Sequence, residues 1–246
     1  EQVFAVNVQG TNNVVDSAVA AGVRRLVHVS SAAVYGSLQR FDIDETTPMR
    51  KSGNIYADSK VDAEMAAIAG HGKHGLSVVA VRATQVYGLN SPHFSMRPLS
   101  LIKRGRMVLI DGGKALCKPV YIDNLVDALL LCASVEAAGG EVLNITDGYT
   151  VTWRDFFGAL AQMAGVQHLP SMPYPLAWSV ALFYELQGRV SGKKPALTRR
   201  AVRSLRSFNS FSNAKACRLL GWQPTIGLDE GMRRTEVWLR ENGHLP

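Results

Sequence analysis

The stretch Tyr56-Ala57-Asp58-Ser59-Lys60 decides how this chain is interpreted, because its tyrosine and lysine are four residues apart. It lies within residues 54–69, whose pattern predicts a helix, and residues i and i+4 of a helix share one face. A lysine ammonium beside a tyrosine phenol stabilises the phenolate, which suits the phenol for proton exchange near neutral pH. This spacing also arises by chance on exposed surface helices, so the pair needs support from neighbouring segments.

Two apolar segments flank the predicted helix. Residues 25–31 (RLVHVSS) and 76–82 have the nearly continuous apolar runs typical of buried parallel strands. The first segment ends in Ser30 and Ser31, and reactive groups collect at the carboxyl ends of strands in open α/β sheets. The order of strand, serine, helix with tyrosine and lysine, and strand therefore predicts an α/β fold with a site at this end of the sheet.

Several sequence blocks together resemble the extended short-chain dehydrogenases/reductases, the NAD-dependent epimerase/dehydratase superfamily. The blocks are NVQGTNNVVDSA from Asn7, VSSAAVYG from Val29, YADSK from Tyr56, RATQVYG from Arg82, VYIDNLV from Val120 and FSNAKACRLLGWQPTIGLDEGM from Phe211. Within this superfamily the chain most resembles the 3β-hydroxysteroid dehydrogenase-like branch. That finer resemblance depends on PALT (Pro195–Thr198), which follows an apolar stretch over residues 174–186.

The resemblance implies an NAD- or NADP-dependent oxidoreductase that interconverts a secondary alcohol and a ketone. Tyr56 would exchange the hydroxyl proton, Lys60 would support the phenolate and hydrogen-bond the nicotinamide ribose, and Ser31 would donate to the substrate oxygen. Asn7 matches a family position near the active site, and Thr84 matches one that touches the nicotinamide. The expected catalytic residues are thus Ser31, Tyr56, Lys60 and Asn7, and the expected cofactor-binding residues are Tyr56, Lys60 and Thr84.

Several alternatives stay open. Ser31 is preferred because family members place the hydroxyl four residues before the Tyr-Gly pair, but Ser30 remains a candidate. Sugar-nucleotide dehydratases carry an Asp-Glu pair where this chain has Ala32 and Ala33, which disfavours dehydration. A sugar-nucleotide epimerase needs only the serine, tyrosine and lysine, and remains possible, as does a non-catalytic or truncated cofactor-binding protein. An epimerase would use arginines for a nucleotide diphosphate, and the candidates are Arg97, Arg104 and Arg106.

The expected fold class is α/β, an incomplete Rossmann-type parallel sheet with a smaller, mainly helical carboxyl-terminal substrate lobe. Residues 1–88 and 116–146 would form the second part of the NAD(P)-binding domain, and residues 89–115 and 147–246 the substrate lobe. The G-x-G-x-x-G over Gly70–Gly75 follows a helix and precedes a strand, the reverse of a phosphate-binding turn, and predicts a plain turn. The first half of the cofactor domain, roughly 80 residues, is therefore expected upstream of residue 1.

Composition restricts the protein class. The chain has 246 residues, of which 47% are hydrophobic and 19% charged, an ordinary globular composition rather than a disordered one. An odd count of three cysteines argues against a disulfide framework and suits a reducing compartment, so a cytoplasmic protein is expected. Neither the cysteines nor the six histidines show metal-ligand spacing, so no metal is expected. No run approaches the roughly 20 apolar residues of a membrane span.

Charge and hydropathy indicate possible partners. Residues 189–246 carry 12 Lys and Arg against 4 Asp and Glu, a net charge of +8, but no nucleic-acid motif accompanies them. Residues 174–186 predict a helix that is apolar nearly all round, followed by Lys193 and Lys194. This favours a hydrophobic, sterol-like substrate and peripheral membrane contact through residues 174–194, although a packing helix explains it equally well. The family resemblance also implies a homodimer formed through residues 1–21 and 54–69.

Overall fold

The structure is a computed structural model that describes residues 2–192 and 195–245. The chain forms two compact units. Unit 1 consists of Glu1–Val86, Pro119–Gly148 and Ser210–Gly227, and unit 2 of Tyr87–Lys118, Tyr149–Asn209 and Leu228–Pro246. Residues 210–227, which were expected in the substrate lobe with the rest of residues 147–246, belong to unit 1, because their apolar side chains join its core.

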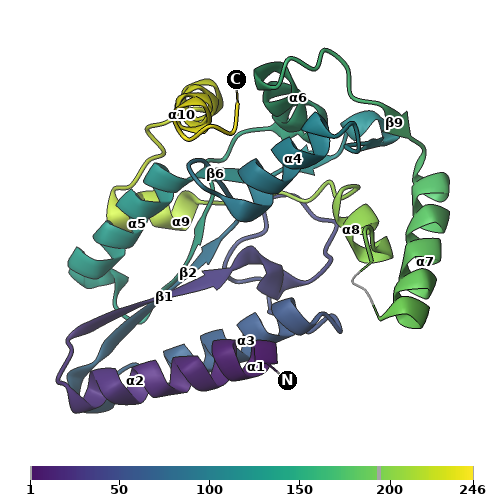
Figure 1. Cartoon of the computed structure of the whole chain (residues 1–246). Helices are drawn as coiled ribbons and strands as arrows, with labels where there is room; N and C mark the ends of the chain where they lie inside the picture. Colours follow the sequence, from purple (N-terminus) through teal and green to yellow (C-terminus); the bar gives the residue numbers. More distant parts are fainter. Residues whose placement is uncertain (1, 193–194, 246) are drawn as a thin grey trace. The chain divides into compact units, whose positions relative to one another are not determined.

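Unit 1 is built on a parallel sheet, which confirms the predicted α/β fold (Figure 1). The strands β1 (Arg25–Ser31), β2 (Ser77–Ala83) and β7 (Val142–Ile145) lie in the order β1-β2-β7, with both pairs parallel. The near-continuous apolar runs of β2 and β7 follow from burial on both faces, since such strands have no solvent-facing side that favours alternation, whereas β1 is only partly buried.

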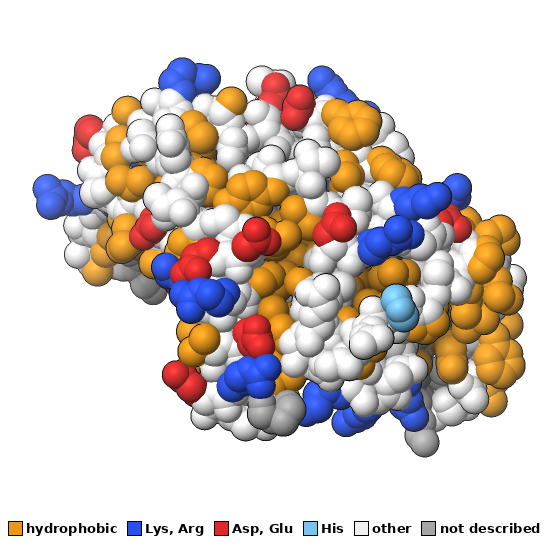
Figure 2. All heavy atoms as spheres, turned by 90° about the horizontal axis from the view of Figure 1, so that it is seen from above, with side chains coloured by type: hydrophobic (Ala, Val, Ile, Leu, Met, Phe, Trp, Pro, Cys, Tyr) orange, Lys and Arg blue, Asp and Glu red, His pale blue; other side chains and the backbone are white. Residues whose placement is uncertain are grey.

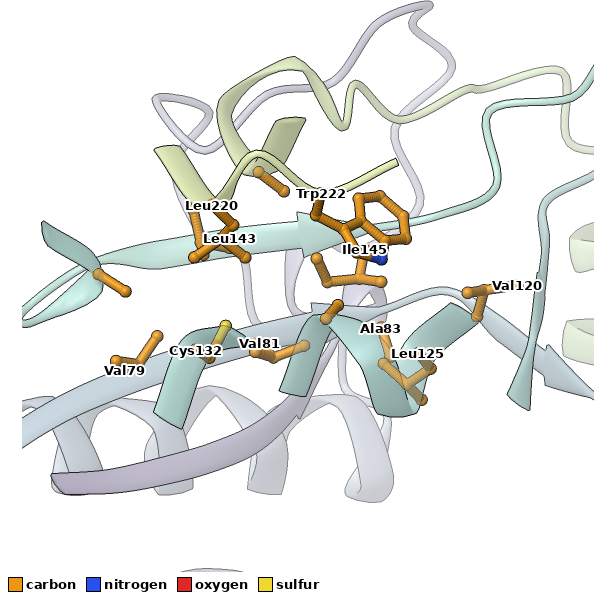
Figure 3. Close-up of a cluster of buried hydrophobic side chains, with 13 residues drawn as sticks. Val79, Val81, Ala83, Val120, Leu125, Cys132, Leu143, Ile145, Leu220 and Trp222 are labelled. Carbon is orange, nitrogen blue, oxygen red and sulfur yellow. The ribbon is translucent and has the colours of Figure 1, made fainter. Parts of the chain in front are cut away.

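Helices cover both faces of this sheet. On one face lie α1 (Gln2–Phe4), the π-helical turn η1 (Ala5–Gln9), α2 (Gly10–Ala20) and α3 (Ile55–Ile68). On the other face, α5 (Ile122–Ser134) and α9 (Ala214–Leu220) enclose the largest part of the unit 1 core (Figure 3). That core is formed by apolar side chains of β2, β7, the two helices and the segment after α9, including Val79, Val81, Leu143, Ile145, Leu125 and Trp222.

The outer edges of the sheet are capped by side chains. At the β7 edge, Glu45 Oε1 accepts a hydrogen bond from the Asn144 backbone N–H at 2.7 Å, and Lys215 Nζ donates to the Val142 carbonyl at 3.0 Å. At the β1 edge, Lys60 Nζ donates to the Val29 carbonyl at 2.7 Å.

Unit 2 is mainly helical, with short two-residue ladders. Its helices are η4 (Pro92–Met96, π-helical), α4 (Arg97–Lys103), α6 (Trp153–Met163), α7 (Tyr174–Ser191), α8 (Arg199–Ser204) and α10 (Leu228–Glu241). Strand β4 (Leu109–Ile110) pairs with β9 (Ser171–Met172), and β5 (Leu116–Cys117) with β8 (Val151–Thr152). Within the described ranges, no helix combines the length and hydropathy that crossing a bilayer requires.

The short connecting elements complete the chain. The 3₁₀ turns are η2 (Ala32–Tyr35), η3 (Lys73–Gly75), η5 (Asp111–Gly113) and η6 (Glu136–Ala138), and the remaining strands are β3 (Gln85–Tyr87) and β6 (Pro119–Tyr121). The Gly-rich segment over residues 70–75 connects the end of α3 to the start of β2 and contains η3. The prediction of a plain turn there is confirmed.

Asn124 and Asp147 form a buried hydrogen-bonded pair that binds the backbone of residues 225–226 in unit 1. Asn124 Oδ1 accepts from the backbone N–H groups of Thr225 and Ile226, and its Nδ2 donates to Asp147 Oδ1 at 2.8 Å. Asp147 Oδ2 accepts from the Tyr121 backbone N–H at 2.8 Å. Burial raises the pKa of Asp147 to about 6, although these hydrogen bonds oppose the increase.

We expect Asp147 to stabilise the fold more at acid pH than at neutral pH. Its pKa rises from 3.8 in the unfolded chain to about 6 in the fold, so the native state holds the extra proton between these values. Its contribution is therefore largest below pH 4 and is lost as the pH rises through 6. At about 1.4 kcal/mol per pH unit this amounts to about 3 kcal/mol.

Urea unfolding of the wild-type protein and of Asp147→Asn at pH 4 and pH 7 measures this contribution. The wild-type protein should gain stability relative to the variant at pH 4. A difference between the two proteins that is the same at both pH values would contradict the raised pKa.

Candidate active site

Helix α3 carries Tyr56 and Lys60 in its first two turns, as the sequence predicted. The helix begins at Ile55 because the Asn54 side chain caps it, accepting from the Ala57 backbone N–H at 2.7 Å. Tyr56 follows directly and is 48% exposed. Its phenol is therefore accessible to a ligand, while the backbone around it is fixed by the cap.

Lys60 reaches from α3 to the end of β1. Its Nζ donates to the Val29 carbonyl at 2.7 Å, two residues before Ser31. Burial lowers the pKa of Lys60, and the negative charge of Glu64, one helical turn away, opposes that effect. An ammonium has three N–H donors, so a single bond to Val29 leaves donor capacity for a phenolate or a ribose hydroxyl.

The two adjacent serines at the end of β1 have different environments. Ser30 is 4% exposed, and its hydroxyl donates to Glu64 Oε2 at 2.5 Å. Ser31 is less buried and caps η2, its Oγ accepting from the Ala33 backbone N–H at 3.2 Å. Because Ser31 uses its oxygen as an acceptor in this bond, its O–H can still donate to a ligand. The geometry favours Ser31 over Ser30 as the substrate-facing hydroxyl.

Asn7 contacts the same helix, whereas Thr84 is held by the sheet. Asn7 Nδ2, in the π-helical turn η1, donates to Ser59 Oγ at 2.9 Å, and Ser59 Oγ donates to the Tyr56 carbonyl at 2.8 Å. Asn7 is therefore tied to the turn of α3 that bears the tyrosine. The Thr84 backbone N–H donates to the Ile145 carbonyl at 3.1 Å and continues the β2–β7 ladder.

His28 lies on β1, two residues before Ser30. Its buried Nε2 has no hydrogen-bond partner in the part of the chain that the structure describes. Burial and, to a smaller extent, the positive charge of Lys60 lower the pKa of His28 to about 4, so the imidazole is neutral at pH 7. Residues i and i+2 of a strand share one face, so the sequence already indicates that His28 lies on the same face of β1 as Ser30.

The described residues fit the nicotinamide end of a dinucleotide site. Unit 1 supplies an exposed phenol and a lysine ammonium from α3, together with a serine hydroxyl at the end of β1. Residues 2–192 and 195–245 contain no strand, Gly-rich turn and helix in the order that binds a pyrophosphate. Over the same residues, no three His, Cys, Asp or Glu side chains gather in a way that could hold a metal ion.

Residues 1–146 match the family model for NAD dependent epimerases and dehydratases. The chain belongs to this family. Membership makes it a nicotinamide-dependent protein of the oxidoreductase or epimerase type and accounts for the parallel sheet and the order of the sequence blocks.

Three similar proteins have names that describe different substrates or none. YbjS of Escherichia coli is 33% identical over 98% of the chain and 73% of its own length. An Arabidopsis thaliana 3beta-hydroxysteroid-dehydrogenase/decarboxylase is 30% identical over 94% of the chain, which spans only 57% of that enzyme. The solved structure of MoeE5 in complex with UDP-glucose and NAD has a TM-score of 0.73 and 26% identity, covering 96% of the chain and 71% of MoeE5.

Proposed function

We propose that this protein is an NAD- or NADP-dependent oxidoreductase that interconverts a secondary alcohol and a ketone on a hydrophobic, sterol-like substrate. The observation that carries the proposal is the bond from Lys60 Nζ to the Val29 carbonyl, since it holds the ammonium at the strand end that bears Ser31. Tyr56 lies one turn earlier on the same helix with an exposed phenol.

In this proposal, Tyr56 and Lys60 act on the proton of the substrate hydroxyl. As the alcohol is oxidised, its O–H proton passes to the Tyr56 phenolate, which the Lys60 ammonium stabilises. Ser31 donates a hydrogen bond to the substrate oxygen and keeps it beside the phenol. Bound NAD(P) would accept the hydride, and a spare Lys60 N–H would bind its nicotinamide ribose. Thr84 would lie beside the nicotinamide, and Asn7 would support α3 through Ser59.

The proposed substrate class is supported by two observations. One relative is named as a 3beta-hydroxysteroid-dehydrogenase/decarboxylase, and α7 in unit 2 exposes large apolar side chains. The runner-up is a sugar-nucleotide epimerase, which the likeness to MoeE5 with bound UDP-glucose favours. Arg97, Arg104 and Arg106 are exposed in unit 2 and are its candidate diphosphate ligands. Net reduction of added NAD(P) by a sterol alcohol distinguishes the oxidoreductase, because an epimerase regenerates its own cofactor.

Replacing Tyr56 with Phe should abolish turnover without unfolding the protein. The ring is retained but the proton-exchanging hydroxyl is lost, and general acid–base catalysis contributes about 10²–10⁴-fold. NAD(P) reduction with a 3β-hydroxysterol by the full-length protein is the measurement, with Tyr174→Phe in unit 2 as the matched control. Wild-type turnover by the Tyr56→Phe variant would contradict the assignment of Tyr56 as the proton-exchanging residue.

Replacing Ser31 with Ala should lower kcat by about 10²–10³-fold, as loss of a donor to the reacting oxygen does elsewhere. Replacing Ser30 with Ala should cost less activity, because its hydroxyl bonds to Glu64 and not to the substrate. Both variants are compared with the same sterol substrate. A larger kcat loss for the Ser30 variant would exchange the two assignments.

The homodimer is a further part of the proposal, formed through the helices around residues 1–21 and 54–69. Its support is the exposure of Val6, Val14, Ile55 and Met65 on η1, α2 and α3, where solvent-facing apolar side chains suit a partner helix. Sedimentation as a monomer at micromolar concentration would contradict it.

We also propose that α7 contacts an anionic lipid surface. Its exposed apolar side chains, Leu176, Phe183, Leu186 and Val190, recur at helical spacing on one face. Hydrophobic side chains gather at the right-hand edge of Figure 2, where Figure 1 places α7. Trp178 instead packs under the guanidinium groups of Arg199 and Arg203, and Lys193 and Lys194 lie outside the described residues.

Flotation with phosphatidylserine vesicles tests this contact. The double variant Phe183→Asp and Leu186→Asp should lose flotation, because two charges replace the apolar face. Leu130→Asp on α5 is the matched control, since Leu130 is as exposed as Phe183, at 63% and 62%. Unchanged flotation of the double variant would exclude α7 as the lipid contact.

A further inference from the structure

A row of polar side chains crosses the three strands of the unit 1 sheet. Ser30 on β1 is in register with Arg82 on β2, and Arg82 is in register with Asn144 on β7. All three are buried. The row lies one residue before Ser31, Ala83 and Ile145, which end the three strands. It is thus the second-to-last row of the sheet, directly before the row that contains Ser31.

Glu64 of α3 joins this row to the helix that carries Tyr56 and Lys60. Glu64 is 1% exposed, and its carboxylate accepts from Arg82 Nη2 at 2.6 Å and from Arg82 Nε at 3.1 Å. It also accepts from the Ser30 hydroxyl. A guanidinium is a rigid planar fork, so a two-point bond to a carboxylate fixes direction as well as distance. The register of α3 against β1 and β2 is therefore set at this point.

Tyr35 extends the network to the turn that follows Ser31. Arg82 Nη1 donates to the Tyr35 hydroxyl at 2.8 Å, and that hydroxyl donates to Asn144 Oδ1 at 2.7 Å. The Arg82 guanidinium also lies over the Tyr35 ring, 4.7 Å from its centre. Gly36 comes next with φ of 71°, which favours glycine, and an added Cβ there would lie 3.3 Å from the Arg50 carbonyl. The Ser31–Gly36 segment is thereby held at both ends.

We propose that Glu64 and Arg82 are positioning residues for the Ser31, Tyr56 and Lys60 site. This inference rests on the proposed function. Three members of the network are close in sequence to groups assigned to the site: Ser30 precedes Ser31, Glu64 is one helical turn after Lys60, and Arg82 is two residues before Thr84. A change in the Glu64–Arg82 geometry would shift the serine and the tyrosine–lysine pair relative to each other.

A contribution to folding stability does not by itself explain the buried ion pair between Glu64 and Arg82. Desolvating two charges offsets most of their attraction, and well-packed apolar residues of similar volume often stabilise a fold as well or better. Apolar side chains make no directional bonds, whereas the planar guanidinium donates hydrogen bonds in fixed directions. A role in position therefore predicts that stability and catalysis respond differently when the pair is replaced by apolar residues.

The test uses the full-length protein with its nicotinamide cofactor and a 3β-hydroxysterol. The first variant is Glu64→Leu, which leaves the Arg82 charge buried without its partner and should lower Tm strongly. The second is the double variant Glu64→Leu with Arg82→Met, which should restore Tm. Its kcat should nevertheless stay about 10²-fold below wild type, because small displacements of reacting groups cost about that much. Cofactor Kd, measured by fluorescence, should stay close to the wild-type value.

Two further variants keep the test decisive. Tyr35→Phe retains the ring but loses both hydroxyl bonds, and should lower kcat about tenfold with unchanged cofactor Kd, even if the double variant fails to fold. Glu141→Gln removes a half-exposed ion pair with Lys215 in the same unit and should leave kcat unchanged. Wild-type kcat in the double variant, or in Tyr35→Phe, would overturn the positioning role. Retained turnover in Tyr56→Phe would instead overturn the proposed function, so the two failures are distinguishable.

Discussion

The buried bond between Glu64 and Arg82 is the interaction on which the arrangement of unit 1 depends. It connects α3 to β2 in the buried interior of unit 1, and a buried charge requires a partner with fixed geometry. Apolar packing alone would allow the helix to slide by small amounts with little cost. The ion pair and its hydrogen bonds allow one register, and that register fixes where the first turns of α3 lie relative to the strand ends.

The same helix also meets the exposed edge of the sheet. Lys60 binds the Val29 carbonyl at the β1 edge, as Lys215 binds the Val142 carbonyl at the β7 edge. Both lysines satisfy backbone oxygens that no neighbouring strand in unit 1 pairs with in the described ranges. Lys60 differs because a phenol lies one turn away and a serine two residues along the strand. The Lys60 ammonium is thus held near the end of the strand that bears Ser31.

Unit 2 has fewer constraints of this kind. Its core is formed by aromatic contacts, such as the stacking of Trp153 on Phe157, and by small residues such as Ala177 and Ala181 where α7 meets α8. One face of α7 is left apolar and exposed. Family membership does not specify a substrate, because the named relatives include both a steroid enzyme and a protein solved with UDP-glucose. The chemistry of that exposed face is therefore the main indication of substrate class within this chain.

The sequence by itself determined the parallel sheet, the helix with Tyr56 and Lys60, and the turn over residues 70–75, because periodicity and helix caps are local properties. It did not determine the two-residue ladders of unit 2 or the placement of residues 210–227 in unit 1, since both depend on partners far along the chain. Only the tertiary structure showed the different hydrogen-bond partners of Ser30 and Ser31 and joined Glu64 to Arg82. Those differences arise from burial and from hydrogen bonds between strands and a helix, which residue spacing cannot encode.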